Sequence, residues 1–414
     1  MHPTATQEGD GMDAPLDGIT IIEITSWMAA PSAGAILADL GADVVKVEPL
    51  RGDALRGMAR QPKLPDGAPR TDYPFEVDNR GKRSIAVALD QPAGAELVRR
   101  LIAGADVLLT NLLPHRQQRY GLTSDALAEV NPALVHATLT GYGLTGPDAR
   151  RPGYDVTAFF GRGAITDFET DPGASAVRPP PAMGDHTTGL AMVGAILAAL
   201  RLAERTGKGQ TVDVSLFATA AWTMATELSA AVIDERQPRK RDRRNLITPL
   251  TNRFCCADDR WIVLNMPEAH WWARFCEVVE RPEWVSDPRF ETVKTRFDNM
   301  PELIDLIDEV FATRTLAEWG DLFDEHGLIW GPARTLAELA TDPQAEAIGL
   351  YPTIDHPEAG TFRTVANPLR ISSADVGPRG PAPALGEHTS DVLAAAGLDA
   401  DDIAKLRADG TIGG

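Results

Sequence analysis

The residue with the clearest chemical potential in this sequence is an aspartate beside a glycine. Asp185 follows Gly184 and precedes a run whose apolar residues recur at three- and four-residue steps, which predicts a helix ending near Gly207. At the start of such a helix, unpaired backbone N–H groups and the helix dipole are expected to keep a carboxylate ionised. An ionised carboxylate held there can attack an acyl carbon as a nucleophile. The same residue can instead serve as an N-cap, and spacing leaves both interpretations open.

The elements that must position Asp185 begin with this helix, whose apolar residues predict one buried face. These residues are Leu190, Val193, Ile196, Leu197 and Leu200. Gly207 with Lys208 beside it is a typical helix stop.

Upstream, strand-like runs alternate with helical ones. The runs rich in Val, Ile and Leu are 18–24, 43–49, 106–111 and 134–140, and the helical ones between them are 33–42 and 93–105. This alternation predicts βαβ units and a doubly wound, Rossmann-like α/β sheet. Because ligands bind beyond the carboxyl ends of such strands, we expect the site in the loops after Ile24, Val47, Asn111 and Thr140.

The composition shifts after about Ala225, where helical patterns broken by Pro and Asp replace the βαβ rhythm. The sequence therefore predicts a large α/β domain over 1–225 and a smaller α+β domain over 226–332. Residues 333–414 are expected to form a connection and a C-terminal return to the large domain.

The composition also excludes several classes of function. A net charge of −19 argues against nucleic-acid or anionic-membrane partners. The first fifteen residues lack the apolar stretch of a signal peptide, and no apolar run suggests a membrane span, so we expect a cytoplasmic protein. Three cysteines, Cys255, Cys256 and Cys276, match neither a disulfide framework nor a metal site.

Two further patterns have ordinary explanations. Residues 141–146 spell GxGxxG, but Pro147 and then Pro152 follow, which predicts a loop rather than the helix that a nicotinamide site requires. The basic run at 234–245 is interpreted as a solvated linker, with an anion site as the alternative.

Several blocks of the chain resemble the class III CoA-transferases, the CaiB/BaiF family, which includes formyl-CoA transferases and α-methylacyl-CoA racemases. The similar blocks are PLDGITIIEIT (15–25), AGAILADLGADVVKVEP (33–49), NRGKRSIAVAL (79–89), NPALVHATLTGYGLTGP (131–147), the segment from Ala182 to Phe217 and LGEHTSDVL (385–393). The resemblance implies that Asp185 is the catalytic residue. It also implies that coenzyme A and its acyl thioesters are substrates, with no permanently bound cofactor and no metal.

The resemblance also places the CoA contacts along the carboxyl edge of the sheet. By block alignment they fall on Ser26, Trp27, Met28, Ala29, Val87, Asn111, Leu112, Arg119 and Tyr154. Two positions depart from the family pattern, because Pro49 and Asp90 stand where family members can have basic residues. Arg51 or Arg56 would then have to serve the CoA phosphates.

The mechanism implied by the resemblance is acyl-CoA transfer, in which CoA moves between carboxylic acids through an aspartyl anhydride and an aspartyl-CoA thioester. The alternatives are a racemase or epimerase, and a CoA-binding protein without turnover. Tyr154 argues against the racemase, since that branch has a histidine there as one of two proton-exchanging bases. His186 is a weak substitute because adjacent residues on a helix point in different directions.

Two expectations concern the smaller domain and the assembly. Ile247, Leu250 and Trp261 would form an apolar wall suited to a bulky acid rather than formate or oxalate. The resemblance implies an interlocked homodimer with an acyl-CoA donor and a carboxylic acid acceptor as substrates. Light scattering distinguishes that dimer from a 44.5 kDa monomer.

Overall fold

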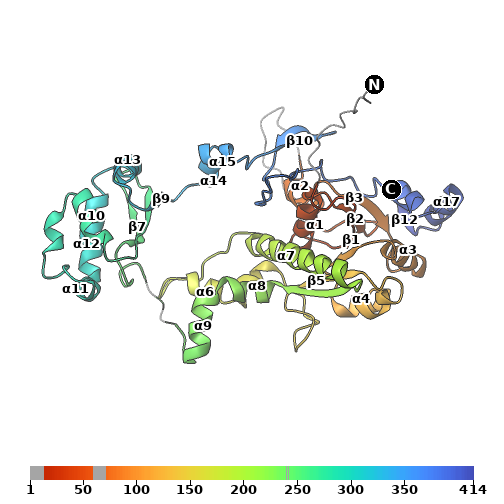
Figure 1. Cartoon of the computed structure of the whole chain (residues 1–414), viewed down its shortest axis with the longest axis horizontal. Helices are drawn as coiled ribbons and strands as arrows, with labels where there is room; N and C mark the ends of the chain where they lie inside the picture. The colour runs from red at the N-terminus through yellow and green to blue at the C-terminus, as the bar shows by residue number, and fades with distance from the viewer. Residues whose placement is uncertain (1–13, 59–70, 239, 241) are drawn as a thin grey trace, which may run out of the picture. The chain divides into compact units, whose positions relative to one another are not determined.

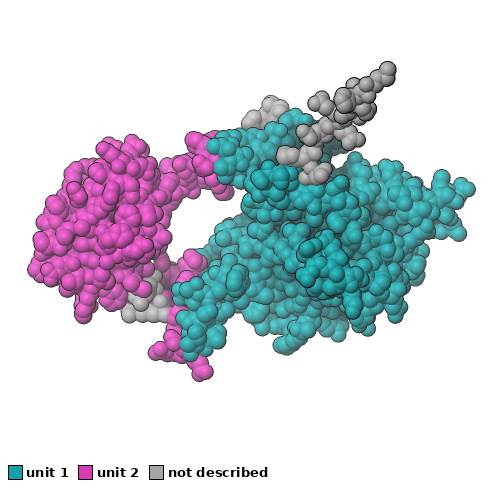
Figure 2. Space-filling model, in the orientation of Figure 1, with its two compact units in different colours: residues 1–167, 177–233, 346–414 teal, residues 168–176, 234–345 magenta. Residues whose placement is uncertain are grey.

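The computed structural model describes residues 14–58, 71–238, 240 and 242–414. It divides into two compact units, which have different colours in Figure 2. Unit 1 is built from residues 1–167, 177–233 and 346–414, and unit 2 from residues 168–176 and 234–345. The domain boundaries predicted at residues 225 and 332 stay a prediction.

Unit 1 is organised around a seven-stranded sheet with the order β12-β3-β2-β1-β4-β5-β6. All neighbours pair in parallel except β12, which is antiparallel to β3. The strands are β1 (Thr20–Ile24), β2 (Asp43–Glu48), β3 (Arg83–Val87), β4 (Val107–Thr110), β5 (Val135–Thr140), β6 (Gln210–Ser215) and β12 (Ile412–Gly413). The first six follow the doubly wound order 3-2-1-4-5-6, so the strand order reverses between β1 and β4.

Helices cover both faces of this sheet, because alternate strand residues point to opposite sides. Ile21 faces a core formed with α1 (Ala29–Asp39) and α7 (Met183–Thr206). Its neighbour Ile22 faces a second core formed with α3 (Pro92–Ile102), α16 (Thr389–Ala395) and α17 (Ala400–Ala408). The C-terminal segment thus packs on the same sheet as β1 (Figure 1).

The remaining elements of unit 1 are shorter. They are α2 (Tyr73–Asn79), α4 (Pro114–Tyr120), α5 (Ser124–Ala128), the π-helical turn η1 (Asp155–Gly161), α6 (Ile165–Glu169), α8 (Leu216–Thr223), α9 (Ala225–Asp234), α15 (Pro343–Ala347) and the β10–β11 hairpin (Thr353–His356 and Gly360–Arg363); α6, α9 and α15 reach or cross the boundary with unit 2.

The helix α7 lies beside α1 in unit 1 (Figure 1) and ends at Gly207, whose φ of 65° is the predicted helix stop. Of the five residues predicted for its buried face, Val193, Ile196 and Leu200 are buried, Leu197 is partly buried and Leu190 is exposed. Gly189 is buried against α1, whereas Leu190 is exposed, because only a glycine permits so close an approach of the two helices. Within the described residues α7 is long and apolar enough to span a membrane, as is the bent pair α8–α9 if counted as one span. One face of α7 is instead used for packing on α1 and the sheet.

The four predicted strand runs correspond to β1, β2, β4 and β5, and the two predicted helices to α1 and α3. The expected mixed α/β fold with a parallel central sheet is therefore confirmed. The loop from Gly141 to Gly146 also contains no helix start, and the next helical turn, η1, begins at Asp155.

Unit 2 has a core of its own. A three-stranded antiparallel sheet consists of β7 (Thr251–Cys255), β8 (Trp261–Asn265) and β9 (Trp330–Pro332). Its helices are α10 (Trp271–Val278), η2 (Pro282–Val285), α11 (Val293–Asp298), α12 (Met300–Phe311), α13 (Leu316–His326) and α14 (Leu336–Leu339). The core is strongly aromatic, with Phe311 stacked on Phe254 at 4.8 Å between ring centroids.

The close contact between α1 and α7 predicts a specific loss of stability. A Cβ added at Gly189 would lie 2.1 Å from Ser32 Oγ and 2.8 Å from the Ala29 carbonyl oxygen. We expect Gly189→Ala to lower the free energy of unfolding by about 1–3 kcal/mol because the helices must separate. Gly194→Ala is the matched control in the same helix, where no atom lies within 4 Å. It should stabilise by up to about 1 kcal/mol through helix propensity. Equal midpoints of denaturant unfolding for the two variants would contradict this account.

Candidate functional site

The point at which the strand order reverses, between β1 and β4, forms the centre of the candidate site. Chains leaving the two strands diverge there and leave a crevice. Asn111, directly after β4, bridges it: its Nδ2 donates to the Ser26 carbonyl oxygen at 2.7 Å, and its Oδ1 accepts the Ser26 N–H at 3.2 Å. The loops predicted to carry the site are thus fixed to each other.

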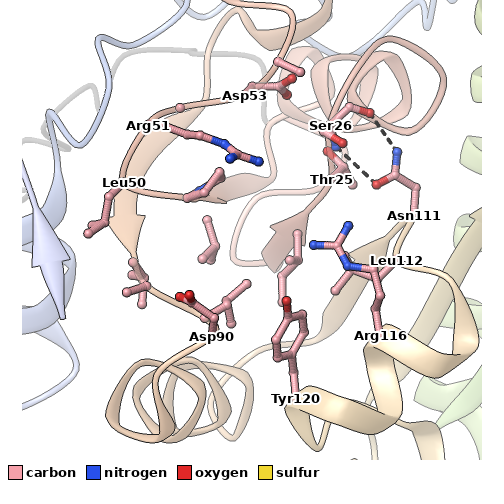
Figure 3. Close-up of a pocket in the computed structure, with 18 of the residues that line it drawn as sticks. Thr25, Ser26, Leu50, Arg51, Asp53, Asp90, Asn111, Leu112, Arg116 and Tyr120 are labelled. Atoms are coloured by element: carbon pink, nitrogen blue, oxygen red, sulfur yellow. Dashed lines mark hydrogen bonds between the residues drawn. The ribbon is translucent and has the colours of Figure 1, made fainter.

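A cavity of about 700 Å³ opens at the carboxyl ends of β1, β2, β3 and β4 (Figure 3). Its lining includes three exposed cations, Arg51, Arg116 and Arg119. Figure 3 shows the guanidinium groups of Arg51 and Arg116 directed into the space between the loops. Asp90 also lines the cavity, so the acidic departure from the family pattern faces the same space. Cations and apolar walls together suit a long anionic ligand.

A buried ion network fixes the loop after β1 beneath this cavity. Lys46 Nζ lies 2.9 Å from Asp53 Oδ2 and 3.2 Å from Glu23 Oε1, with all three side chains fully buried. Asp53 Oδ1 in turn accepts the backbone N–H of Trp27 at 3.1 Å. Trp27 has a φ of 70°, which is unfavourable for a bulky residue. The carboxylate of Asp53 therefore helps hold Trp27 in its strained conformation.

Burial opposes the positive charge on Lys46, but the carboxylates of Glu23 and Asp53 raise the pKa of this amine. Burial lowers the pKa of a second amine, Lys82, to about 8, although Glu23 lies 2.8 Å from its Nζ. The network is thus built from paired charges, since an unpaired buried charge is strongly destabilising.

A second cavity of about 210 Å³ contains Asp185. Its other walls are largely apolar, with Leu139, Tyr154 and Leu216 among them. The two cavities share lining residues, namely Ser26, Trp27, Asn111, Leu112 and Arg116. The indole of Trp27 meets the ring of Tyr154 edge to face, at 5.7 Å between centroids. Asp185 is therefore in the cavity that adjoins the cationic one.

The carboxyl group of Asp185 is not held ionised, contrary to the expectation from the helix dipole. Burial raises its pKa to about 7, and the nearby negative charge of Asp155 adds to this, whereas His186 acts in the opposite direction. Within the described residues, its carboxylate makes no ion pair and receives no hydrogen bond. Loss of water with no compensating donor outweighs the dipole.

The N-cap interpretation of Asp185 is wrong, because α7 begins at Met183 and its N-cap position is Ala182, with a φ of 62°. A second acidic residue, Asp155, begins η1, which packs on α7, and burial raises the pKa of its carboxyl group. Asp185 is thus free of a capping role.

His186 points away from the cavity that contains Asp185 and towards α2. Its Nε2 lies 3.0 Å from Oδ1 of Asp78, which is 1 % exposed. The hydrogen bond to Asp78 raises the pKa of His186. His186 lines neither cavity. This agrees with its description above as a weak substitute for the second base of a racemase.

The structure brings together most of the predicted CoA contacts. Those lining one or both cavities are Ser26, Trp27, Ala29, Val87, Asn111, Leu112, Arg119 and Tyr154. Met28 lines neither and packs instead beside Leu55 and Phe75. Of the two substitute cations, Arg51 lines the larger cavity, whereas Arg56 is bound to Glu48 through an ion pair of 2.5 Å. Arg56 is therefore a structural residue.

Sequence reasoning missed Arg116, which lines both cavities, and Asp155 and Asp78, which act on the charge of Asp185. Arg116 carried a signal, since it precedes Arg119 by one helical turn in the short helix α4, and residues at that spacing share a helix face. Asp155 and Asp78 carried none, because they reach the site only through the packing of η1 and α2 on α7.

In unit 2, Ile247 and Leu250 line a cavity of about 60 Å³, and Trp261 is not among its lining residues. The basic run is partly paired: Arg243 forms two contacts with Asp308 at 2.6 and 2.7 Å, and Arg244 pairs with Asp305. Residues 239 and 241 lie outside the described residues. Across the described part of the chain, no group of three His, Cys, Asp or Glu side chains could hold a metal ion.

Comparison with known proteins identifies the family. The model of CoA-transferase family III matches residues 16–389. A (R)-2-hydroxy-4-methylpentanoate CoA-transferase of Clostridioides difficile is 31% identical, over 94% of this chain and 97% of its own length. A human succinyl-CoA:glutarate CoA-transferase is 31% identical, over 92% of this chain and 85% of its own length.

The fold has a solved counterpart at similar identity. The crystal structure of a CaiB/BaiF family protein from Brucella suis superposes with a TM-score of 0.81 at 31% identity. The match covers 93% of this chain and 100% of that one.

The raised pKa of Asp185 predicts a pH-dependent gain in stability when its charge is removed. A carboxyl group whose pKa is higher folded than unfolded binds more protons when folded, so it lowers stability as the pH rises from about 4 to about 7. We expect Asp185→Asn to be more stable than the wild type, with a gain that grows between pH 5 and pH 8. Thermal midpoints across this range measure it. A gain that is independent of pH would show that ionisation of Asp185 has no such effect.

Proposed function

This chain belongs to CoA-transferase family III, and on that premise we propose that it moves CoA between carboxylic acids through covalent intermediates on Asp185. The observation that carries the proposal is a carboxylate in an apolar cavity with no structural partner among the described residues. The adjoining cavity is large and lined by cations, as a CoA thioester requires.

The reaction proceeds by two exchanges at one carboxylate. An Asp185 oxygen attacks the thioester carbon of the donor, the C–S bond breaks, and CoA leaves as a thiolate. The product is a mixed anhydride. The thiolate then attacks the Asp185 carbonyl carbon, which releases the donor acid as a carboxylate and leaves Asp185 as a CoA thioester. An acceptor carboxylate repeats these steps in reverse and restores Asp185.

The pKa of about 7 suits this role. Near neutral pH about half of the Asp185 groups are ionised, and a more basic carboxylate is a stronger nucleophile than an ordinary one.

The CoA chain is proposed to lie along the shared wall of the two cavities. Its phosphates would meet Arg51, Arg116 and Arg119, while the pantetheine arm passes Asn111 towards Asp185. Val87 and Leu112 supply apolar contact surface. In this arrangement CoA is a substrate, and no permanently bound cofactor or metal is needed.

The acyl group is proposed to be apolar. Leu113, Leu139 and Leu216 line the cavity around Asp185, and among the described residues that line it Arg116 is the one cation. Exchange of labelled acids against a panel of acyl-CoA donors would identify the acyl-CoA donor and the acceptor acid.

The site favours neither a racemase nor a CoA-binding protein without turnover. A racemase needs a second base besides Asp185, and the cavity that contains Asp185 is lined by Tyr154 and by no histidine among the described residues. A CoA-binding protein without turnover would gain nothing from a half-buried carboxylate without a partner among the described residues, since such a group costs stability. Incorporation of deuterium at the α-carbon of a chiral acyl-CoA would reveal racemase chemistry.

We also propose that the protein is a cytoplasmic homodimer. Three apolar side chains of α8 and α9 support self-association, since Trp222, Val232 and Ile233 are 80%, 69% and 79% exposed in the single chain. Exposed apolar surface of this kind is typical of an interface.

Substitution of Asp185 tests the mechanism. Asp185→Asn cannot form the anhydride, so we expect transfer to fall by at least about a thousandfold, equivalent to roughly 4 kcal/mol. Its thermal midpoint serves as the control for folding. Incubation of the wild type with acyl-CoA and then hydroxylamine should trap a hydroxamate at Asp185, detected by peptide mass spectrometry. Near-normal transfer in the variant, with no adduct on the wild type, would rule out the mechanism.

The cationic lining predicts a loss of substrate affinity. Arg51→Ala and Arg116→Ala should each raise KM for acyl-CoA roughly tenfold or more, since a charge-assisted hydrogen bond contributes about 1.5–3 kcal/mol. Arg83→Ala is the control, because Arg83 pairs with Asp43 at the opposite ends of the strands. An equal rise in KM for the control would show a general electrostatic effect instead of specific contacts.

A further inference from the structure

Trp27 is a bulky residue held in a backbone conformation that favours glycine. Its φ of 70° lies in the left-handed region, where a Cβ is unfavourable. Strain of this kind persists only where the surrounding structure enforces it, and it is concentrated at functional sites. A sharp turn alone would be served better by a glycine at this position. The presence of a large aromatic side chain therefore points to a role for the indole itself.

Side chains from two neighbouring loops fix the backbone on both sides of this indole. Asn111 holds Ser26 by two hydrogen bonds, which Figure 3 shows as dashed lines. Asp53 Oδ1 accepts the N–H of Trp27 at 3.1 Å. Asp53 is in turn fixed by its ion pair with Lys46, in which both side chains are fully buried. The backbone at Trp27 therefore cannot rotate without breaking these interactions.

The indole fixed in this way belongs to the wall of the cavity that contains Asp185. Trp27 lines this cavity as well as the larger cationic one, whereas Tyr154 lines only the cavity with Asp185. The rings of Trp27 and Tyr154 meet at an interplanar angle of 87°, with 5.7 Å between centroids. Tyr154 is itself held at the start of η1, where Thr157 Oγ1 accepts its backbone N–H at 3.0 Å. The contact places the indole on the Asp185 side of the shared wall.

We propose that Trp27 selects the acyl group, and that the preferred substrates are carboxylic acids that carry an aromatic ring. This inference rests on the proposed function, because it names the class of acyl group that Asp185 would transfer. Trp27 acts through shape and ring contact and takes no part in the covalent steps.

The geometry of the two rings suits a third ring. Aromatic rings prefer offset-stacked or edge-to-face arrangements, with about 4.5–7 Å between centroids. Because Trp27 and Tyr154 stand nearly at a right angle, a ligand ring between them can stack on one side chain while its edge meets the other. A saturated ring of the same size gains only the burial of its apolar surface. The leucines that line the same cavity supply that burial to either kind of ring, so the aromatic pair provides the discrimination.

The cavity around Asp185 also has room for such a group. Its volume is about 210 Å³. An apolar cavity of about 150 Å³ takes a benzene molecule, so a ring and a short link to the thioester fit here. A second carboxylate on the acyl group would instead need Arg116, which the proposed arrangement assigns to the CoA phosphates.

The test compares two acyl groups that differ in the ring alone. The pair is 3-phenylpropanoyl-CoA and 3-cyclohexylpropanoyl-CoA, which share the CoA portion, the chain length and the number of carbon atoms. Exchange of each thioester with an excess of its own isotope-labelled acid gives kcat/KM for the thioester without a choice of acceptor. General losses of folding or of CoA affinity cancel in the ratio of the two values. We expect the wild type to favour the phenyl compound roughly tenfold, equivalent to about 1.4 kcal/mol.

Substitutions of Trp27 should change this ratio. Trp27→Leu and Trp27→Phe carry the same backbone strain as the wild type, because both keep a Cβ at this φ. Trp27→Leu should reduce the preference to about twofold or less, whereas Trp27→Phe should retain most of it. If Trp27→Leu fails to fold, Trp27→Gly provides the same test, since glycine adopts this φ without strain. Met28→Leu is the control from the same loop and should leave the ratio unchanged, because Met28 lines neither cavity.

A purely structural residue would lower both rates and leave their ratio unchanged. The inference is overturned by a wild type that shows no preference for the phenyl compound, or by a folded Trp27→Leu variant that keeps the wild-type preference. A wild type that exchanges neither ring compound but transfers an aliphatic or dicarboxylic acyl group also overturns it.

Thioether analogues separate this inference from the function on which it rests. S-(3-phenylpropyl)-CoA and S-(3-cyclohexylpropyl)-CoA have no carbonyl carbon and cannot react with Asp185. Calorimetry should show that the wild type binds the phenyl analogue more tightly, and that Trp27→Leu binds the two alike. Normal transfer by Asp185→Asn would refute the proposed function and leave this difference in affinity standing. Equal affinity of the wild type for the two analogues, with Asp185→Asn inactive, would refute the role of Trp27 alone.

Discussion

The close packing at the first turns of α7 is the constraint on which the rest of the site depends. Gly184 lies against the ring of Phe159, and Gly189 lies against α1, so neither position has room for a Cβ. Asp185 stands between these two contacts. The proposed nucleophile must be held to a fraction of an ångström, and a helix pressed between two neighbours provides that rigidity better than a loop. The glycines thus act by excluding side chains and not through backbone flexibility.

The other half of the site is fixed by charge. The loop after β1 must turn sharply at the point where the strand order reverses, and Trp27 adopts a strained backbone conformation there. The Lys46–Asp53 pair lies beneath it, and Asp53 binds the Trp27 amide. Removal of one partner would leave an unpaired buried charge, so the pair resists rearrangement of the loop. In a chain of net charge −19, the larger cavity is nevertheless lined by the cations Arg51, Arg116 and Arg119, and local positive charge of this kind favours anions.

The sequence predicted those parts that depend on local pattern. Short apolar runs located β1, β2, β4 and β5, and the doubly wound order then placed the candidate loops at one edge of the sheet. It failed where tertiary packing decides. The helical period placed Leu190 in the core, but the approach of α1 selected Gly189. The capping preference of aspartate pointed to Asp185, but α7 already begins at Met183, so Asp185 lies within the first turn of the helix and not at its N-cap.

The ionisation of Asp185 was also beyond local rules, and it shows how the site balances stability against reactivity. An aspartate at a helix start is ordinarily acidic because amides and dipole favour its charge. Here burial and a like-charged neighbour outweigh both, so the folded protein carries a carboxylate that would be more stable protonated. A carboxylate with an ordinary pKa near ~4 would be fully ionised at neutral pH but a weaker nucleophile, and one with a much higher pKa would rarely be ionised. A value of about 7 maximises the product of ionised fraction and basicity near neutral pH, which is the condition that favours attack on a thioester.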